Sequence, residues 1–388
     1  MSGKYQAYPE YKYSDIDWLE EIPLHWQTSK LRYMFSFGKG LTITKANLID
    51  DGVACVNYGE VHSKYGFEVN PAIHPLKCVS KEYLKTSPSA LLSKGDIVFA
   101  DTSEDIEGSG NFTQLMNEEA VFAGYHTIIA RPKDHNFDRF YAYLFDSQQI
   151  RTQIRYAVKG VKVFSITQAI LRSIGIWLPT LEECRKIANF LDHETAKIDT
   201  LIEKQQQLIK LLKEKRQAVI SHAVTKGLNP NAPMRDSGVE WLGGVPEHWQ
   251  VTRAKFLFDF VTSGSRGWAE YFADSGALFF RITNLTRDTI EPKLESIQFV
   301  KPPLGSEGVR AKIKNDDLLI SITADLGSIC VANDSIAGGY VSQHVSLCRP
   351  NRGVASSRWL GYCILSDLAK EQLLGSGYGG TKIQLSLA

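Results

Sequence analysis

The chain has 388 residues, and its 44 Lys and Arg residues nearly balance its 43 Asp and Glu residues. A net charge of +1 gives no overall field that would attract an acidic polymer, so such a partner would have to be met by local patches. The length suits roughly two to three domains. A content of 22% charged and 43% hydrophobic residues is ordinary for a soluble globular protein.

The sequence disfavours both a membrane protein and a disulfide-stabilised protein. No apolar run approaches the roughly 18 residues that span a bilayer, and the N-terminal "MSGKYQAYPEYKYSD" lacks the apolar core of a signal peptide. We therefore expect a cytoplasmic protein without a membrane partner. No CxxC pair and no zinc-finger spacing accompanies the cysteines, so free thiols and no bound metal are expected for Cys55, Cys78, Cys184, Cys330, Cys348 and Cys363.

A segment near the start of the chain is repeated past its middle. "DWLEEIPLHWQ" at residues 17–27 returns as "EWLGGVPEHWQ" at residues 240–250. Further on, Asp96 matches Asp317 and Arg131 matches Arg349. The period is far longer than the roughly 20–50 residues of solenoid repeats. The chain therefore reads as a tandem duplication, with a first domain at 1–179, a helical spacer at 180–227 and a second domain at 228–388.

Each domain combines strands and helices. Short β-type runs at residues 96–100 and 126–132, and again at 277–283 and 317–323, alternate with turns rich in Gly, Ser and Asn. One helix-like segment follows in each copy, at residues 137–158 and 356–376. The predicted fold class is α+β, with two similar mixed α/β domains joined by a long coiled-coil spacer helix.

The spacer is predicted as a helix over residues 181–226. Thr180 and Glu183 form a capping-box pattern at its start, and Gly227 is a natural stop. Such a helix is at most about 69 Å long, and shorter if residues 192–195 break it. A heptad pattern predicts a subunit interface along one stripe, made of Leu191, Ile198, Leu201, Gln205, Leu208, Leu212 and Val219. Gln205 either fixes the register of two paired helices or lies at a solvent-exposed edge of the stripe.

These features resemble a known family, the DNA specificity (S) subunits of type I restriction-modification enzymes. The resemblance covers nearly the whole chain, and its most specific parts are the "WL..IP..W" segments, "GDIVFA", "DLLISITADLG" and "LPTLEECRKIANFLDHETAKIDTLIEK". It implies that each domain is a target recognition domain for one half of a split double-stranded DNA sequence. It also implies that the helix sets the gap between the halves, and that modification (methyltransferase) and restriction subunits are the protein partners.

One departure from the family pattern concerns a second helix. The family carries another conserved helix after the second domain, whereas this sequence stops at Ala388. Either the sequence is a truncated product or two chains pair through the spacer helix as a homodimer. An alternative function follows from the first possibility: a truncated S-like DNA-binding protein that acts without enzymes, as a decoy or repressor.

Candidate DNA-binding residues lie in loops and in basic, glycine-containing segments. Lys, Arg, hydroxyl and amide groups suit contacts to phosphates and base edges. The predicted backbone clamps are Arg151, Arg155, Lys159 and Lys162 in the first domain, and Thr381 and Lys382 in "GSGYGGTK" in the second. The predicted base readers are Thr102, Ser103, Glu104 and Asn111, then Arg281, Asn284, Arg287, Thr323 and Asp325. A solvated surface role is the more common one for any single residue of this kind.

No catalytic residue is predicted. His25 and His248 recur without a carboxylate or serine pattern, which favours a structural turn. "GSGYGGTK" lacks the Gly-Lys-Ser/Thr order of a phosphate loop. We expect a non-catalytic subunit without its own cofactor. The resemblance implies that S-adenosylmethionine, ATP and Mg act on the partner subunits.

Overall fold

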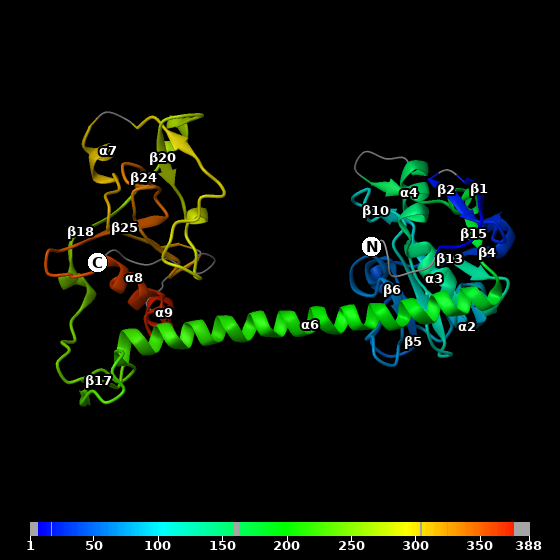
Figure 1. Cartoon of the computed structure of the whole chain (residues 1–388), viewed down its shortest axis with the longest axis horizontal. Coiled ribbons are helices and arrows are strands. Elements are labelled where there is room, and N and C mark those ends of the chain that lie inside the picture. Colours follow the sequence, from blue (N-terminus) through cyan, green and yellow to red (C-terminus); the bar gives the residue numbers. More distant parts are fainter. Residues whose placement is uncertain (1–6, 17, 159–162, 303–304, 324, 376–388) are drawn as a thin grey trace. The chain divides into compact units, whose positions relative to one another are not determined.

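The computed structural model describes residues 7–16, 18–158, 163–302, 305–323 and 325–375 (Figure 1). The chain divides into two compact units, residues 1–202 and 203–388. The division falls within the long helix α6 (Leu181–Lys226), so each unit holds one end of that helix.

The first unit contains two main sheets. Hydrogen-bonded neighbours in the five-stranded sheet are, in order, β4 (Phe35–Lys39), β13 (Thr127–Pro132), β9 (Ile97–Ala100), β11 (Phe112–Leu115) and β6 (Phe67–Val69). The four-stranded sheet has the order β7 (Cys78–Val79), β5 (Val53–Val56), β12 (Val121–Ala123) and β8 (Leu91–Leu92). Three strand pairs complete it: β1 (Tyr11–Ile16) with β2 (Leu19–Pro23), β3 (Gln27–Lys30) with β15 (Gly175–Leu178), and β10 (Thr102–Ser103) with β14 (Phe164–Ser165).

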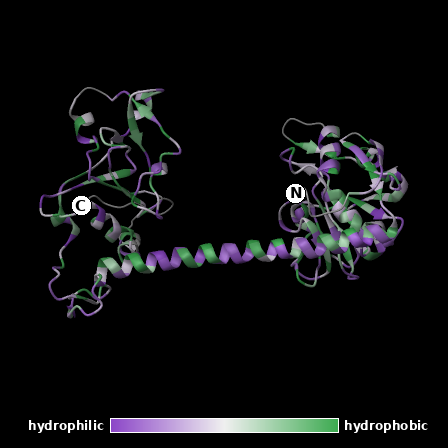
Figure 2. Ribbon diagram, in the orientation of Figure 1, coloured by the Kyte–Doolittle hydropathy of each residue, from purple (hydrophilic) through white to green (hydrophobic). Residues whose placement is uncertain are grey.

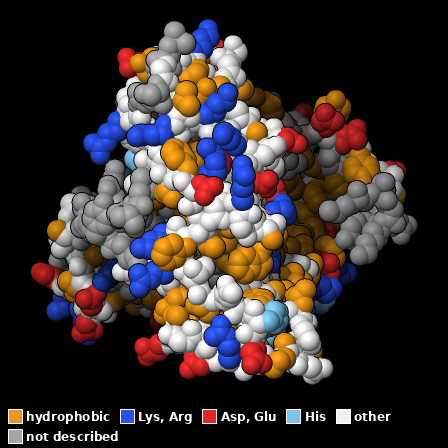
Figure 3. All heavy atoms as spheres, turned by 90° about the vertical axis from the view of Figure 1, so that its left-hand side faces the viewer, with side chains coloured by type: hydrophobic (Ala, Val, Ile, Leu, Met, Phe, Trp, Pro, Cys, Tyr) orange, Lys and Arg blue, Asp and Glu red, His pale blue; other side chains and the backbone are white. Residues whose placement is uncertain are grey.

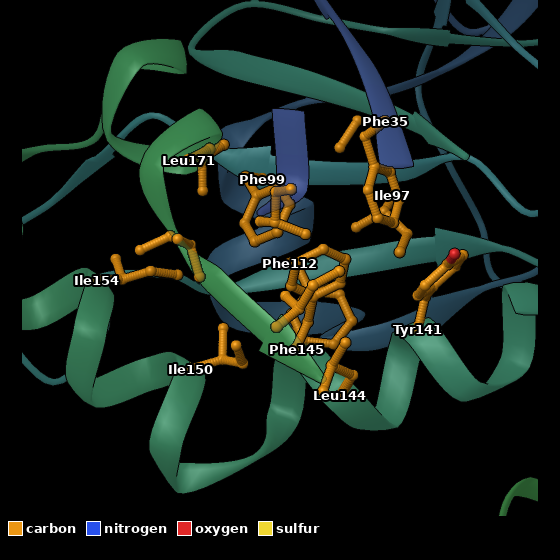
Figure 4. Packing of buried hydrophobic residues seen from close by; sticks show 14 of the residues in the cluster. Phe35, Ile97, Phe99, Phe112, Tyr141, Leu144, Phe145, Ile150, Ile154 and Leu171 are labelled. Atoms are coloured by element: carbon orange, nitrogen blue, oxygen red, sulfur yellow. The ribbon is translucent and has the colours of Figure 1, made fainter. Parts of the chain in front are cut away.

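Helices cover the five-stranded sheet of the first unit. They are α1 (Leu31–Met34), α3 (Asp138–Asp146), α4 (Gln148–Ala157) and α5 (Gln168–Ser173), and α2 (Tyr83–Thr86) lies between β7 and β8 in the chain. Figure 4 shows the core, in which Phe99 and Phe112 from the strands meet Tyr141 and Phe145 from α3. Phe35 closes this cluster, with its ring centroid 4.7 Å from that of Tyr141.

The second unit repeats this plan. One sheet has the order β18 (Phe258–Ser263), β25 (Val345–Pro350), β22 (Leu318–Ser321) and β23 (Ile329–Val331). The other has the order β19 (Phe272–Ala273), β21 (Phe299–Val300), β20 (Ala277–Phe280) and β24 (Tyr340–Val341). The remaining elements are β16 (Met234–Asp236), paired with β17 (Gly244–Pro246), and the helices α7 (Ser306–Arg310), α8 (Ser357–Leu365) and α9 (Asp367–Gly375).

Strands β4, β13, β9 and β11 of the first unit share their order with β18, β25, β22 and β23 of the second, and the central pairs share register. Ile97 of β9 lies opposite Ala130 of β13, and Leu318 of β22 lies opposite Cys348 of β25. Ile97 and Leu318 each follow one of the repeated aspartates, so sequence matching and strand pairing coincide. This confirms the predicted fold class of two similar mixed units with a long helix between them in the chain.

One sequence prediction of secondary structure was wrong in the same way in both units. Each segment predicted as a single helix is two helices, because a serine ends the first one. The Ser147 hydroxyl donates to the Leu144 carbonyl at 2.6 Å, and the Ser366 hydroxyl donates to the Cys363 carbonyl at 2.6 Å. A serine side chain that bonds to nearby backbone competes with helix continuation.

Helix α6 matches its prediction at both ends and is unbroken between them. The backbone N–H of Glu183 donates to the Thr180 hydroxyl at 3.3 Å, while the Glu183 carboxylate accepts the Thr180 N–H at 3.1 Å. Gly227 follows Lys226 with a φ of 77°, the left-handed conformation that favours glycine at a helix end. Asp192 and Thr195 do not break the helix, and the Thr195 hydroxyl donates to the Leu191 carbonyl at 2.7 Å.

A buried Asp–Arg pair occupies the same position in each unit. Arg131 Nε lies 3.1 Å from Asp96 Oδ2, and Arg349 Nη2 lies 2.7 Å from Asp317 Oδ2. Each aspartate is only 1% exposed. Each carboxylate also accepts the backbone N–H three residues earlier, from Ser93 at 2.9 Å and Lys314 at 2.8 Å.

Burial raises the pKa of Asp96, although the Ser93 N–H and Arg131 favour its ionised form. Arg131 also donates to the Leu91 carbonyl, at 2.5 Å. One guanidinium therefore joins the turn before β9, the strand β13 and the start of β8.

Arg131→Ala should leave the Asp96 carboxylate buried and unpaired. Loss of one partner of a buried ion pair costs about 3–5 kcal/mol, so the urea midpoint of the first unit should fall markedly. The matched control is Lys94→Ala, because Lys94 forms an exposed pair with Glu118 at 3.8 Å whose loss costs about 0–1 kcal/mol. Equal urea midpoints for the two variants would contradict this account.

Candidate nucleic-acid interface

The repeated segment that begins at Trp18, here called the Trp segment, forms hydrogen bonds with the start of α6 in the first unit. His25 Nε2 lies 2.9 Å from the Glu183 carboxylate, and Trp26 Nε1 donates to it at 3.4 Å. Partial burial disfavours the ionised carboxylate, but the hydrogen bonds from His25, Thr180 and Trp26 outweigh it and lower the pKa of Glu183 to about 2. The prediction that His25 has a structural role thus agrees with its position in this junction.

The loop after β9 carries the first set of predicted base readers. Thr102 and Ser103 form β10, which pairs with β14, and Ser103 is 2% exposed. Glu104 is exposed. Asn111 lies at the other end of the loop, where its side-chain amide is 3.3 Å from His62 Nδ1.

Arg151 and Arg155 of α4, which were predicted to contact the DNA backbone, form hydrogen bonds with this loop. Arg151 donates to the Asn111 side-chain oxygen at 3.2 Å and pairs with Asp146 at 2.8 Å. Arg155 donates to the Glu107 carbonyl and pairs with its carboxylate, both at 2.9 Å. The structure therefore brings Arg151 and Asn111 together, while Lys159 and Lys162 lie outside the described residues.

Two residues beside Asn111 were missed by the sequence prediction. Tyr58 and His62 follow β5, and their rings stack with centroids 5.3 Å apart and planes 12° apart. Burial raises the pKa of Tyr58, and Glu104 and Asp105 add to the shift. A signal was available in the sequence, because the segment after β5 corresponds to the segment after β20 from which Arg281 was chosen.

The equivalent loop of the second unit places three predicted readers in two polar groups. Thr323 Oγ1 lies 2.9 Å from His344 Nδ1. Arg287 pairs with Asp325 at 2.5 Å, and it also donates to the Leu326 carbonyl at 3.2 Å. Both Arg287 and Asp325 remain more than one-third exposed.

Asn284 has a different environment from the other candidates. It is 1% exposed, its amide donates to the carbonyls of Lys293 and Ser296 at 2.9 Å, and its oxygen accepts the Arg281 N–H at 2.9 Å. These bonds fix the loop around it. Arg281 donates to the Ser296 hydroxyl at 3.2 Å, whereas Thr381 and Lys382 lie outside the described residues.

A second repeated histidine was also missed. His126 and His344 each lie five residues before the arginine of the buried pair. His126 Nδ1 is 3.2 Å from the Asp101 carboxylate, and His344 contacts Thr323, so each histidine touches the loop that leaves the central strand. The constant spacing to Arg131 and Arg349 was the available signal.

The described part of the chain contains no cluster of three or more His, Cys, Asp or Glu side chains that could hold a metal ion. Over the same residues, no helix combines the length and apolar character needed to cross a membrane. All six cysteines are free thiols in this structure.

Comparison with known proteins gives one consistent family. Residues 23–211 match the family described as type I restriction modification DNA specificity domain. A putative type I restriction enzyme MjaX specificity subunit from Methanocaldococcus jannaschii is 24% identical over 73% of this chain and 63% of its own length. The type I restriction enzyme EcoKI specificity subunit from Escherichia coli K12 is 24% identical over 61% of this chain and 48% of its own length.

The fold agrees with this family. A chain in a solved structure of a type I R-M system superposes with a TM-score of 0.58 at 19% identity, covering 91% of this chain and 81% of that one. The shared architecture is thus a pair of sheet-rich domains with a long helix. Residues 23–211 thus form a type I restriction modification DNA specificity domain by sequence similarity, and the chain spans about half to two-thirds of the length of the curated relatives it matches.

Glu183→Gln tests the junction between the Trp segment and α6. A carboxylate whose pKa falls from 4.5 to about 2 on folding contributes stability above pH 4.5 that is lost as the pH falls toward 2. The wild-type urea midpoint should therefore drop more steeply than that of Glu183→Gln between neutral and acidic pH. Glu203→Gln, at an exposed position of the same helix, should keep the wild-type pH dependence; parallel curves for all three proteins would contradict the assignment.

Proposed function

We propose that this chain recognises a bipartite, gapped DNA sequence, with each unit reading one half. The observation that carries this proposal is that the two units share their strands but differ in their loops. Both units keep the strand register and the buried Asp–Arg pair, yet the loops that leave β9 and β22 carry different side chains. Two similar frames with different loops suit two different half-sites.

The chemistry of the two loops fits base and phosphate contacts. In the first unit, His62, Asn111 and Arg151 form one connected polar group beside the exposed Glu104. In the second, Arg287 with Asp325 and Thr323 with His344 form two such groups. Arginine and asparagine have the donor geometry that reads guanine and adenine in the major groove. Asn284 is better suited to organising its loop than to contacting DNA.

Helix α6 is proposed as the spacer between a first domain at residues 1–179 and a second at 228–388. Rigid separation of two readers would set the number of unread base pairs, since half-site spacing is a geometric property of the protein. Both ends of the helix are held by their own unit. Glu183 bonds to the Trp segment at one end, and Gln217 donates to the Leu365 carbonyl at 2.9 Å at the other.

Catalysis is assigned to partner subunits. We propose that modification subunits, with S-adenosylmethionine, and restriction subunits, with ATP and Mg²⁺, act where this chain places them. Their contact surface would include the heptad stripe of α6, whose Ile198, Leu201, Leu208, Leu212 and Val219 are 48–59% exposed. Figure 2 shows hydrophobic residues interspersed with hydrophilic ones along this helix.

The proposed function is tested by co-expressing the chain with its modification subunit and mapping methylated adenines across the host genome. A split motif with two unlike halves is expected, because the two loops differ. Arg287→Ala should relax one half only, by about 1–3 kcal/mol of base discrimination at one position. Asn111→Ala is the reciprocal variant and should affect only the other half. Methylation without any split motif would exclude the proposal.

The heptad stripe is tested by Leu201→Asp combined with Leu208→Asp. Charges in an apolar contact should abolish capture of the modification subunit, because buried unpaired charges are costly. Gln206→Asp with Lys210→Asp, at exposed polar positions of the same helix, should bind normally. Sedimentation of the chain alone then shows whether the stripe also supports a homodimer. Unchanged complex formation by the leucine variant would remove the stripe from the interface.

A further inference from the structure

A short basic and aromatic motif follows the Trp segment in both units and has no role in the proposal so far. It reads Lys30-Leu31-Arg32-Tyr33 in the first unit and Arg253-Ala254-Lys255-Phe256 in the second. The spacing from Trp26 to Lys30 equals that from Trp249 to Arg253. Each motif therefore presents cation, spacer, cation and aromatic ring in the same order, and we call it the basic–aromatic turn.

The structure gives the two turns the same local geometry. In each unit the motif falls on a single helical turn that leads into the edge strand, β4 or β18. The Arg32 guanidinium carbon lies 4.8 Å from the centroid of the Tyr33 ring, and Lys255 Nζ lies 5.3 Å from that of Phe256. Tyr33 and Phe256 are 59% and 63% exposed, so neither ring is there to fill a core.

The four cations of the two turns are available for an outside partner. Lys30, Arg32, Arg253 and Lys255 are all exposed, and none of them forms an ion pair within the described residues. Figure 3 shows Lys and Arg side chains, with Asp and Glu side chains among them, on the face of the second unit that it draws. The Arg32 guanidinium also donates to the Tyr33 hydroxyl at 2.9 Å, so this ring orients its cation as well as lying beside it.

In the first unit the turn borders a cleft of about 700 Å³. Trp18 and Tyr156 stack at this cleft with ring centroids 4.3 Å apart, and they are 49% and 71% exposed. Trp18 has a φ of 75°, a conformation that is strained for a bulky residue and commonest at functional sites. Asp15 also lines the cleft and offsets part of its charge.

Helix α4 lies between this cleft and the loop after β9 that carries Glu107 and Asn111. Gln153 and Tyr156 line the cleft, while Arg151 and Arg155 of the same helix bond to Asn111 and Glu107 of the loop. A duplex bound at the loop would therefore have a basic, aromatic surface on the other side of α4.

We propose that the basic–aromatic turns bind backbone phosphates of duplex DNA next to each half-site. The inference rests on the proposed function and adds a contact that is the same in both units. The duplication has diverged in the reading loops but has kept charge here, with Lys and Arg exchanged between the two cation positions. A phosphate accepts either cation, whereas paired recognition of a planar carboxylate favours Arg specifically. The DNA backbone is chemically identical at both half-sites, which explains why both turns stay alike.

The test measures how the affinity of the full chain for a fluorescein-labelled duplex of arbitrary sequence depends on salt, by anisotropy. Each phosphate contact adds about 0.9 to the slope of log K against log salt. Lys30→Ala with Arg32→Ala should lower the slope by about 2, and Arg253→Ala with Lys255→Ala should do the same. Exchanging the cations, Lys30→Arg with Arg32→Lys, should leave the wild-type slope.

Lys81→Ala with Lys85→Ala, at exposed lysines on or next to α2, is the matched control and should keep the wild-type slope. The inference is overturned if the turn variants keep the wild-type slope, or if the control loses as much as they do. Normal DNA binding with loss of the co-expressed modification subunit would assign the turns to a protein partner and would also overturn it. A wild-type chain that binds no duplex would defeat the proposed function itself, and the inference with it.

Discussion

The buried Asp–Arg pair is the constraint on which each unit depends. An ionised carboxylate that is almost fully buried is stable only when it is paired and hydrogen-bonded. Asp96 and Asp317 meet this condition through one arginine of the neighbouring strand and one backbone N–H of the preceding turn. The need to pair this charge holds the central strand in one register against its neighbour.

The turn before each aspartate carries the same backbone requirement. Gly95 has a φ of 89° and Asp316 has a φ of 68°, so the chain passes through the left-handed region at the same step in both units. At Gly95 this φ strains any residue with a side chain, and an added Cβ would lie 1.9 Å from Asp138 Oδ2, so the Asp138 side chain would have to move. With the turn, the charge and the register fixed together, the loops at the far ends of β9 and β22 are free to differ, as two unlike half-sites would require.

Local signals made much of this fold predictable from the sequence. The ends of α6 depend on Thr180, Glu183 and Gly227, which act through neighbouring backbone groups, and the predicted bounds match the structure. The central strands were predicted to within a few residues because their apolar runs are bounded by turns. The serine breaks at Ser147 and Ser366 were missed, since the flanking residues favour helix on both sides and only the side-chain bond to the backbone ends it.

The candidate site was less predictable because it is assembled from distant segments. Tyr58 and His62 meet Asn111 and Arg151 only when β5 and β9 are packed in their separate sheets. Asn284 has the composition of a base reader, yet its burial depends on the carbonyls of Lys293 and Ser296. Comparing the two copies would have found His126 and His344, because a residue kept in both units at one position carries more information than its type alone.

The middle of α6 carries an apolar stripe that is largely open to solvent. Its ends are bonded to their units, but its apolar stripe is only partly buried, since Leu201, Leu208 and Leu212 remain about half exposed. Covering such side chains yields about 25 cal/mol for each Å² of apolar surface removed from water. A partner that covers the stripe would therefore stiffen the spacer as it binds. Under the proposed function, the same contact that recruits an enzyme would also fix the distance between the two readers.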